Sequence, residues 1–304
     1  MGRYAVIDIG TNSVKLFAGR VVHGRVTPLT DELAVTRLGQ GLSLTGELAE
    51  EAMTRTARQV AAFRVRAEDL AVEKVVAVGT EALRSATNAD EFLDLARRLA
   101  KLRVQVLDGQ EEARLAHLAV RSSLDDLPER LIVIDAGGGS TEFVAAESGR
   151  VVSRASVPVG SRVLTDRLVR GNPPGTAALR ALRDAVREAF AGLELPPGAV
   201  VAVGGAPTTM ATVSRSLPAH EPAAVHGSRL SREEIGRLAA RFAALTLAAR
   251  RRLPGLMPAR ADVALAGAVI LEEALIRCGA DELTVCARGL RHGVFHDRFA
   301  PPPA

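Results

Sequence analysis

Aromatic residues, cysteine and long apolar runs are scarce in this chain, and each shortage excludes a class of protein. Aromatic residues make up 3% of the 304 residues and do not alternate with a basic block, which argues against nucleic-acid binding by base stacking. The two cysteines, Cys278 and Cys286, are too few for a disulfide framework and favour a reducing, cytoplasmic compartment. No apolar run approaches the roughly 20 residues that span a bilayer, and the N-terminus lacks the pattern of a secretory signal. We therefore expect a globular cytoplasmic protein that binds neither nucleic acid nor membrane.

Lysine is also scarce, and the positive charge comes almost entirely from arginine. The only lysines are Lys15, Lys74 and Lys101, although the net charge is +4 and the isoelectric point about 9.6. Arginine is the better bidentate ligand for phosphate, but the same bias could reflect codon composition. The charge balance favours an acidic small ligand.

The most informative stretch is Leu131–Val144, L-I-V-I-D-A-G-G-G-S-T-E-F-V. Its β-branched start predicts a buried strand that ends on Asp135. Three successive glycines cost backbone entropy, so they indicate a backbone that approaches a ligand closely, such as an anion held by consecutive N–H groups. Asp135 and Glu142 would place negative charge beside that anion, which favours a bridging hard cation such as Mg²⁺. The alternative is a glycine-rich hairpin turn with a solvated acid on each side.

The same order of elements occurs twice in the chain. Residues 4–22 predict a strand, a tight turn that follows Asp8, and a second strand, as does the stretch around Asp135. The segment V-V-A-V-G occurs at 75–79 and again at 200–204, at nearly the same offset. A weaker third pair begins at Val104 and Leu283, and its wider offset indicates an insertion in the second half.

These repeats predict a duplicated α/β fold with two domains, 1–124 and 125–304. The insertion should lie at about 214–262 and contain an amphipathic helix that starts at Ser231. The last helix could belong to the second domain or pack back on the first. Two related α/β domains would face a cleft, and ligands of such sheets bind beyond the ends of the strands.

Three further segments are candidates for chemistry. The turn at 204–209, G-G-A-P-T-T, could bind phosphate, although it matches neither the P-loop nor the dinucleotide fingerprint. Glu111 and Glu112 begin a predicted helix in D-G-Q-E-E-A-R, where acids favour the helix dipole, but a carboxylate facing the cleft could also take a proton from water. Arg84 follows the first V-V-A-V-G strand and is either a surface residue or a phosphate clamp.

Together these motifs resemble the exopolyphosphatase / guanosine pentaphosphate phosphohydrolase (Ppx/GppA) family, of the superfamily of actin, sugar kinases and acetate kinase. The segments that carry the resemblance are I-D-I-G-T-N-S-V-K-L, G-T-E-A-L-R-S-A-T-N, G-Q-E-E-A-R-L, V-I-D-A-G-G-G-S-T-E-F-V, V-P-V-G-S-R-V-L-T, V-G-G-A-P-T-T-M-A, L-P-G-L-M-P-A-R-A-D-V and G-L-R-H-G. They run in the family's order over nearly the whole chain. The resemblance therefore implies two actin-like, ribonuclease H-like domains that face a cleft.

The resemblance implies stepwise hydrolysis of a terminal phosphoanhydride with Mg²⁺, or alternatively Mn²⁺, as cofactor. By motif, Glu112 resembles the general base that activates water, and Asp135 and Glu142 resemble the acids that position the metal and the water. Asp8 would assist the metal. The implied phosphate ligands are Thr11, Asn12, Ser13, Arg84, Gly137, Gly138, Gly139, Ser140, Gly204 and Gly205. Longer relatives carry extra C-terminal modules, so we expect this short two-domain form to prefer shorter polyphosphate chains.

Several functions stay open at this point. The substrate implied first is inorganic polyphosphate, and the alternative is guanosine pentaphosphate, which the motifs do not separate. A kinase of the same superfamily would need an acceptor site, and the G-Q-E-E-A-R segment argues against it. A non-catalytic sensor of polyphosphate or alarmone would gain nothing from three acids beside a polyanion. A homodimer is expected by analogy with the family.

Overall fold

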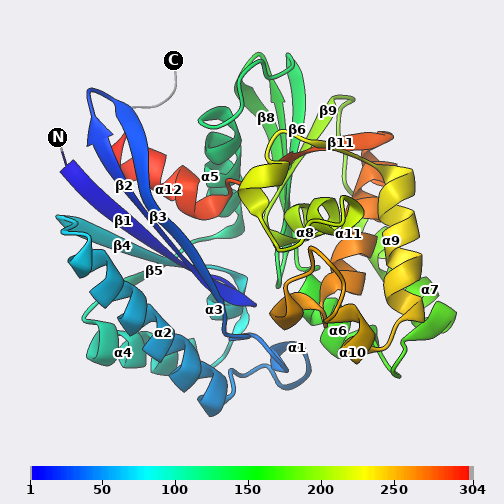
Figure 1. The fold of residues 1–304 in the computed structure, drawn as a ribbon, viewed down its shortest axis with the longest axis horizontal. Coiled ribbons are helices and arrows are strands. Elements are labelled where there is room, and N and C mark those ends of the chain that lie inside the picture. Colours follow the sequence, from blue (N-terminus) through cyan, green and yellow to red (C-terminus); the bar gives the residue numbers. More distant parts are fainter. Residues whose placement is uncertain (1, 301–304) are drawn as a thin grey trace. The chain divides into compact units, whose positions relative to one another are not determined.

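The computed structural model describes residues 2–300, which form two compact units (Figure 1). Unit 1 comprises residues 2–122 and 290–300, and unit 2 comprises residues 123–289. The repeats predict a boundary at 124/125 and leave the position of the last helix open, whereas in the structure residues 290–300 lie in unit 1. No helix within residues 2–300 has the length and apolar character needed to cross a membrane.

Unit 1 is built on a five-stranded sheet in the order β3-β2-β1-β4-β5. Its strands are β1 (Gly2–Ile9), β2 (Ser13–Val22), β3 (Arg25–Val35), β4 (Lys74–Gly79) and β5 (Val104–Val106). The first three form an antiparallel meander, and β4 and β5 continue parallel to β1. Successive side chains of β1 point to opposite faces, so Ile7 and Val6 enter different apolar cores. Apolar side chains on both faces of the sheet must therefore be buried by other elements.

Helices cover both faces of the unit 1 sheet (Figure 1). The helices of unit 1 are α1 (Leu42–Thr45), α2 (Glu50–Asp69), α3 (Glu81–Ser85), α4 (Ala89–Ala100), α5 (Gly109–Arg121) and α12 (Leu290–Phe299). α2 and α4 pack on the face of Ile7, and α5 and α12 pack on the face of Val6. Arg291 of α12 donates a 2.7 Å hydrogen bond to Asp31 of β3. Apolar burial and this ion pair explain why the last helix lies in unit 1.

Unit 2 contains a six-stranded sheet in the order β10-β11-β9-β6-β7-β8. Its strands are β6 (Arg130–Ala136), β7 (Thr141–Glu147), β8 (Arg150–Val157), β9 (Ala199–Val203), β10 (Arg229–Ser231) and β11 (Glu282–Cys286). Its helices are α6 (Ser161–Leu168), α7 (Gly175–Phe190), α8 (Gly205–Ser214), η1 (Pro222–Val225), α9 (Arg232–Ala244), α10 (Leu247–Arg250), η2 (Pro258–Arg260) and α11 (Ala264–Cys278). Ile132 and Ile134 of β6 share one apolar core with α7, α9 and α11.

The two sheets repeat one topology, which confirms the predicted duplicated α/β fold of the actin-like class. β6, β7, β8, β9 and β11 occupy the places that β1, β2, β3, β4 and β5 occupy in unit 1. The strand directions also agree, with an antiparallel meander followed by two parallel strands. Both copies of V-V-A-V-G lie at equivalent strands, the first within β4 and the second in β9 with its glycine, Gly204, directly after the strand. The weak third pair, from Val104 and Leu283, lies in β5 and β11.

The segment between β9 and β11 is longer than its counterpart in unit 1 and contains β10, α9 and α10. α9 starts where the sequence predicts, with a capping box at Ser231. The Ser231 hydroxyl accepts from the backbone N–H of Glu234 at 3.2 Å, and the Glu234 carboxylate accepts from the backbone N–H of Ser231 at 2.9 Å. These bonds satisfy N–H groups that would otherwise lack partners at the helix start.

Candidate functional site

The two predicted phosphate loops share one turn. In unit 1 the backbone N–H of Gly10 donates to the carbonyl of Ser13 at 3.0 Å, between β1 and β2. In unit 2 the N–H of Gly137 donates to the carbonyl of Ser140, also at 3.0 Å, between β6 and β7. The repeat seen in the sequence is therefore a repeat of loop geometry as well as of strands.

The glycine loop of unit 2 turns its N–H groups away from α6. The carbonyls of Gly137 and Gly138 accept from the N–H groups of Ser161 and Arg162, at 3.0 and 2.9 Å. Because a trans peptide points its N–H opposite to its carbonyl, the N–H groups of Gly138 and Gly139 face the other way. Two such neighbouring donors form the kind of nest that binds an anion.

Asp135 and Glu142 lie directly opposite each other on β6 and β7. Directly opposite residues share a face of the sheet, with Cβ atoms about 5 Å apart. Asp135 is 9% exposed and Glu142 is 1% exposed. The Glu142 carboxylate accepts hydrogen bonds from the hydroxyls of Ser140 at 2.6 Å and Ser156 at 2.8 Å. The structure thus brings together the two acids that the sequence singled out and adds Ser156, which the motifs did not indicate.

The third predicted loop lies beside Asp135. Gly204 follows β9 with φ 99°, and a Cβ at this position would come within 2.9 Å of Asp135 Oδ1, so only glycine fits. α8 starts at the next residue, Gly205, and a helix N-terminus attracts anions. The Arg260 guanidinium donates to the carbonyl of Gly205 at 3.3 Å, which adds positive charge here.

In unit 1, Asp8 is opposite Lys15 across β1 and β2. The Asp8 carboxylate is 1% exposed, and its Oδ2 lies 2.9 Å from Lys15 Nζ. Sequence reasoning predicted Asp8 as a metal ligand and missed Lys15 as its partner. The pairing could have been predicted, because a hairpin pairs residues that are equally far from its turn, as Asp8 and Lys15 are.

The predicted base Glu112 and the predicted clamp Arg84 lie together in unit 1. α3 follows β4 and α5 follows β5, so both helices begin at the carboxyl edge of the parallel strands. Arg84 Nη1 donates to Glu112 Oε2 at 2.8 Å, and Glu112 is 7% exposed. Burial alone would lower the pKa of Arg84, but the carboxylates of Glu112 and Glu81 raise it above its ordinary value. Arg84 therefore stays charged, and its donors face carboxylates in this structure.

The donors in unit 2 fit a magnesium ion. Within residues 2–300, no group of three or more His, Cys, Asp or Glu side chains could hold a metal by itself. Mg²⁺, however, commonly takes one or two carboxylates and completes its shell with phosphate oxygens and water. Asp135 and Glu142 are adjacent, buried and provide only oxygen donors, which is the chemistry this ion selects.

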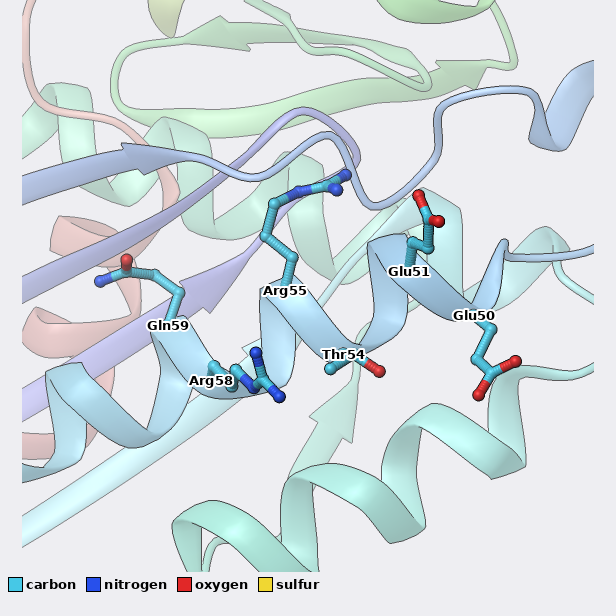
Figure 2. A pocket seen from close by; sticks show the side chains of 6 residues that line it. All are labelled: Glu50, Glu51, Thr54, Arg55, Arg58 and Gln59. Carbon is cyan, nitrogen blue, oxygen red and sulfur yellow. The ribbon is translucent and has the colours of Figure 1, made fainter.

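A separate cavity of about 740 Å³ lies along α2 (Figure 2). It is lined by Glu50, Glu51, Thr54, Arg55, Arg58 and Gln59. Figure 2 shows that these side chains come from successive turns of this single helix. Arg55 Nε donates to the carbonyl of Thr36 at 2.7 Å, which holds the end of β3 against the helix. None of the predicted site residues lines this cavity.

The repeated topology, with a polar turn after an aspartate in each unit, is that of an actin-like α/β protein. Within this class, the chain belongs to the Ppx/GppA phosphatase family, whose family model matches residues 18–300. The resemblance drawn from the motifs is confirmed, and the chain is a hydrolase, as predicted.

Curated relatives and solved structures agree with this assignment. The chain is 31% identical to exopolyphosphatase 2 of Mycobacterium tuberculosis over 96% of this chain and 97% of the relative. It is 35% identical to a guanosine-5'-triphosphate,3'-diphosphate pyrophosphatase of Photobacterium profundum, over 62% of this chain and 37% of the relative. The Aquifex aeolicus PPX-GPPA enzyme matches with a TM-score of 0.81 and 32% identity, over 98% of this chain and 99% of that structure. An exopolyphosphatase from Cytophaga hutchinsonii matches with a TM-score of 0.85 and 26% identity, over 97% and 96%.

Proposed function

We propose that this protein is an exopolyphosphatase, which hydrolyses the terminal phosphoanhydride of inorganic polyphosphate and releases orthophosphate. The observation that carries the proposal is the buried carboxylate of Glu112, which Arg84 holds at the first turn of α5. Asp8 points to the sheet face that α5 covers, so the loop after it starts on the same side. A carboxylate in this position suits a general base that takes a proton from water.

The remaining predicted residues suit the binding of a phosphate chain. Phosphoryl transfer spreads negative charge over the non-bridging oxygens, so catalysis depends on fixed donors and on positioning. In the proposal, N–H groups and hydroxyls of Thr11–Ser13, Gly137–Ser140 and Gly204–Gly205 supply these donors. Arg84 as a direct phosphate clamp remains a prediction, because its guanidinium donates to Glu81, Leu107 and Glu112 in this structure.

The proposal assigns Mg²⁺, or Mn²⁺ in its place, to Asp135 and Glu142. When bound, the cation would neutralise phosphate charge and help to order the attacking water. Ser140 and Ser156 hold the Glu142 carboxylate in place by hydrogen bonds at 2.6 and 2.8 Å. Asp8 is a weaker candidate ligand than these two acids because Lys15 already neutralises its charge.

Guanosine pentaphosphate is the second candidate substrate. The similarity to the Photobacterium profundum pyrophosphatase favours it, since this is the higher of the two identities. The similarity to exopolyphosphatase 2 favours polyphosphate, since it extends over nearly all of both chains. We rank polyphosphate first because the match to exopolyphosphatase 2 covers 96% of this chain, whereas the match to the pyrophosphatase covers 62% of it.

The direct test is orthophosphate release from polyphosphate of defined length, in Mg²⁺ and again in EDTA. Glu112→Gln keeps the shape of the side chain but cannot accept a proton, so we expect a loss of about 10²-fold or more in kcat. EDTA should abolish turnover by the wild type. Glu111→Gln, at the neighbouring position of α5, is the matched control and should retain turnover.

Each other outcome points to a different reading. Near-normal turnover by Glu112→Gln would reject Glu112 as the base. Turnover of guanosine pentaphosphate but not of polyphosphate would select the second candidate. Tight binding of polyphosphate by calorimetry without turnover of either substrate would indicate a non-catalytic sensor.

A further inference from the structure

Glu81 and Arg84 form a fork at the start of α3. Arg84 donates from Nε and from Nη2 to Glu81 Oε2, at 3.1 and 2.6 Å. The other oxygen of Glu81, Oε1, accepts a short hydrogen bond from the hydroxyl of Ser85. Both oxygens of the Glu81 carboxylate are thus held, and the Arg84 and Glu81 side chains are each only 18% exposed. The fork therefore restricts the orientation of the Arg84 guanidinium.

The opposite side of the same guanidinium contacts α5 and Leu107, which lies between β5 and α5. Arg84 Nη1 donates to the carbonyl of Leu107 at 2.7 Å and to Glu112 Oε2 at 2.8 Å. Arg84 therefore lies between two carboxylates, with Glu81 on one side and Glu112 on the other. Because a guanidinium is planar and rigid, fixing one side of it fixes the direction of the other.

We propose that Glu81 is a positioning residue that acts on Glu112 through Arg84. Glu81 holds Arg84, and Arg84 restricts the orientation of the Glu112 carboxylate by donating to its Oε2. This inference rests on the proposed function, in which Glu112 is the general base. A base that turns away from the attacking water loses proton-transfer efficiency even if the substrate still binds.

The chain provides a matched control for this fork in Glu111 and Arg114. They have the same i,i+3 spacing, and Arg114 donates from Nε and Nη2 to Glu111 at 2.8 Å each. Arg114 also contacts a second carboxylate, Asp297 of α12, at 2.7 Å. Both forks join a glutamate to an arginine, but only the arginine held by Glu81 contacts Glu112. A purely structural role would give Glu81→Gln and Glu111→Gln similar effects.

The kinetic test measures kcat and KM for phosphate release by Glu81→Gln, Arg84→Met and the double variant. We expect Glu81→Gln to lower kcat about tenfold with KM within about twofold, and Glu111→Gln to leave both near wild type. In the Arg84→Met background, Glu81→Gln should cause no further loss, because Glu81 acts only through Arg84. Glu81→Asp, which keeps the charge, should recover part of kcat.

Two kinetic results would overturn the inference. A rise in KM at constant kcat would mean that the fork serves substrate binding. An equal loss from Glu81→Gln in the presence and absence of the Arg84 guanidinium would mean that Glu81 acts by another route. If the wild type releases no phosphate, the proposed function itself fails, whereas a wild-type-like Glu81→Gln beside an active wild type refutes this inference alone.

A measurement that needs no turnover tests the contact itself. The Nε–H signal of Arg84 in ¹⁵N NMR should show a rigid side chain in the wild type, in Glu111→Gln and in Glu112→Gln. It should become mobile in Glu81→Gln, since the fork to Glu81 accounts for the Nε and Nη2 bonds. A rigid Arg84 in Glu81→Gln would show that Glu81 does not hold it.

Discussion

The same position in the two units carries opposite charge. Lys15 is opposite Asp8 in unit 1, and Glu142 is opposite Asp135 in unit 2, each two residues after the serine that closes the turn. In unit 1 the buried aspartate is neutralised by a lysine at 2.9 Å. In unit 2 two buried carboxylates share a face of the sheet.

This difference separates a structural pair from a candidate functional pair. A buried acid beside a lysine is compensated within the protein. In unit 2 the two opposed side chains are both carboxylates, and such a pair of oxygen donors suits a hard cation. The duplicated fold thus gives both units the same turn after an aspartate, but only unit 2 carries two opposed acids beside it. We therefore place the proposed Mg²⁺ in unit 2.

The largest expected effect comes from giving unit 2 the charge pattern of unit 1. In Glu142→Lys, the new ammonium would pair with Asp135 and repel a cation, so we expect phosphate release to fall by about 10²-fold or more. Mg²⁺ should also no longer raise the melting temperature, as it should in the wild type. The control is Glu147→Lys, at the exposed end of the same strand. Mg²⁺-dependent turnover in Glu142→Lys would remove this acid from the site.

A smaller effect, on stability, should follow from removing the lysine of unit 1. In Lys15→Met the Asp8 carboxylate stays buried without its ion-pair partner, and Lys15 is itself 20% exposed, so we expect a loss of about 2 kcal/mol in the free energy of unfolding. Urea denaturation at pH 7 measures it. Adding Asp8→Asn should recover most of the loss, and Lys74→Met, at an exposed position of β4, should change little. A stable Lys15→Met would show that Asp8 has another source of compensation.

The smallest effect concerns a feature that the two units share. Burial lowers the pKa of His117 in unit 1 from 6.5 to about 4, with a further contribution from Arg121, and burial together with Arg260 does the same to His220 in unit 2. Between pH 6.5 and pH 4 these histidines are protonated in the unfolded chain but stay neutral in the folded protein. The free energy of unfolding should therefore fall as the pH drops from 6.5 toward 4.

For His117, which is 6% exposed, the loss at pH 5 should be about 2 kcal/mol at most. Urea denaturation at pH 7 and pH 5 measures it, and His117→Gln should lose less stability between these two values than the wild type. An equal loss in both proteins would assign the pH dependence to other groups.

Hairpin pairing explains how much of the site could be predicted. The motif around Asp135 correctly placed a strand, a turn and a second strand, and the pairing of Asp135 with Glu142 follows from the turn between them. The pairing of Asp8 with Lys15 follows in the same way. Ser156 could not be found, because it contacts Glu142 only after a third strand folds back with a shifted register.

The sequence by itself determined the repeat, the buried strands, the polar turns and the family. These depend on local patterns, such as β-branched runs, successive glycines and capping residues, which act over a few positions. Only the tertiary structure decided that Arg84 holds Glu112, which is 28 positions away in the sequence. It also decided that α12 belongs to unit 1, where α12 contacts Asp31 and shares an apolar core with α5. Such contacts depend on which faces the sheet leaves to be covered, and no local pattern specifies that choice.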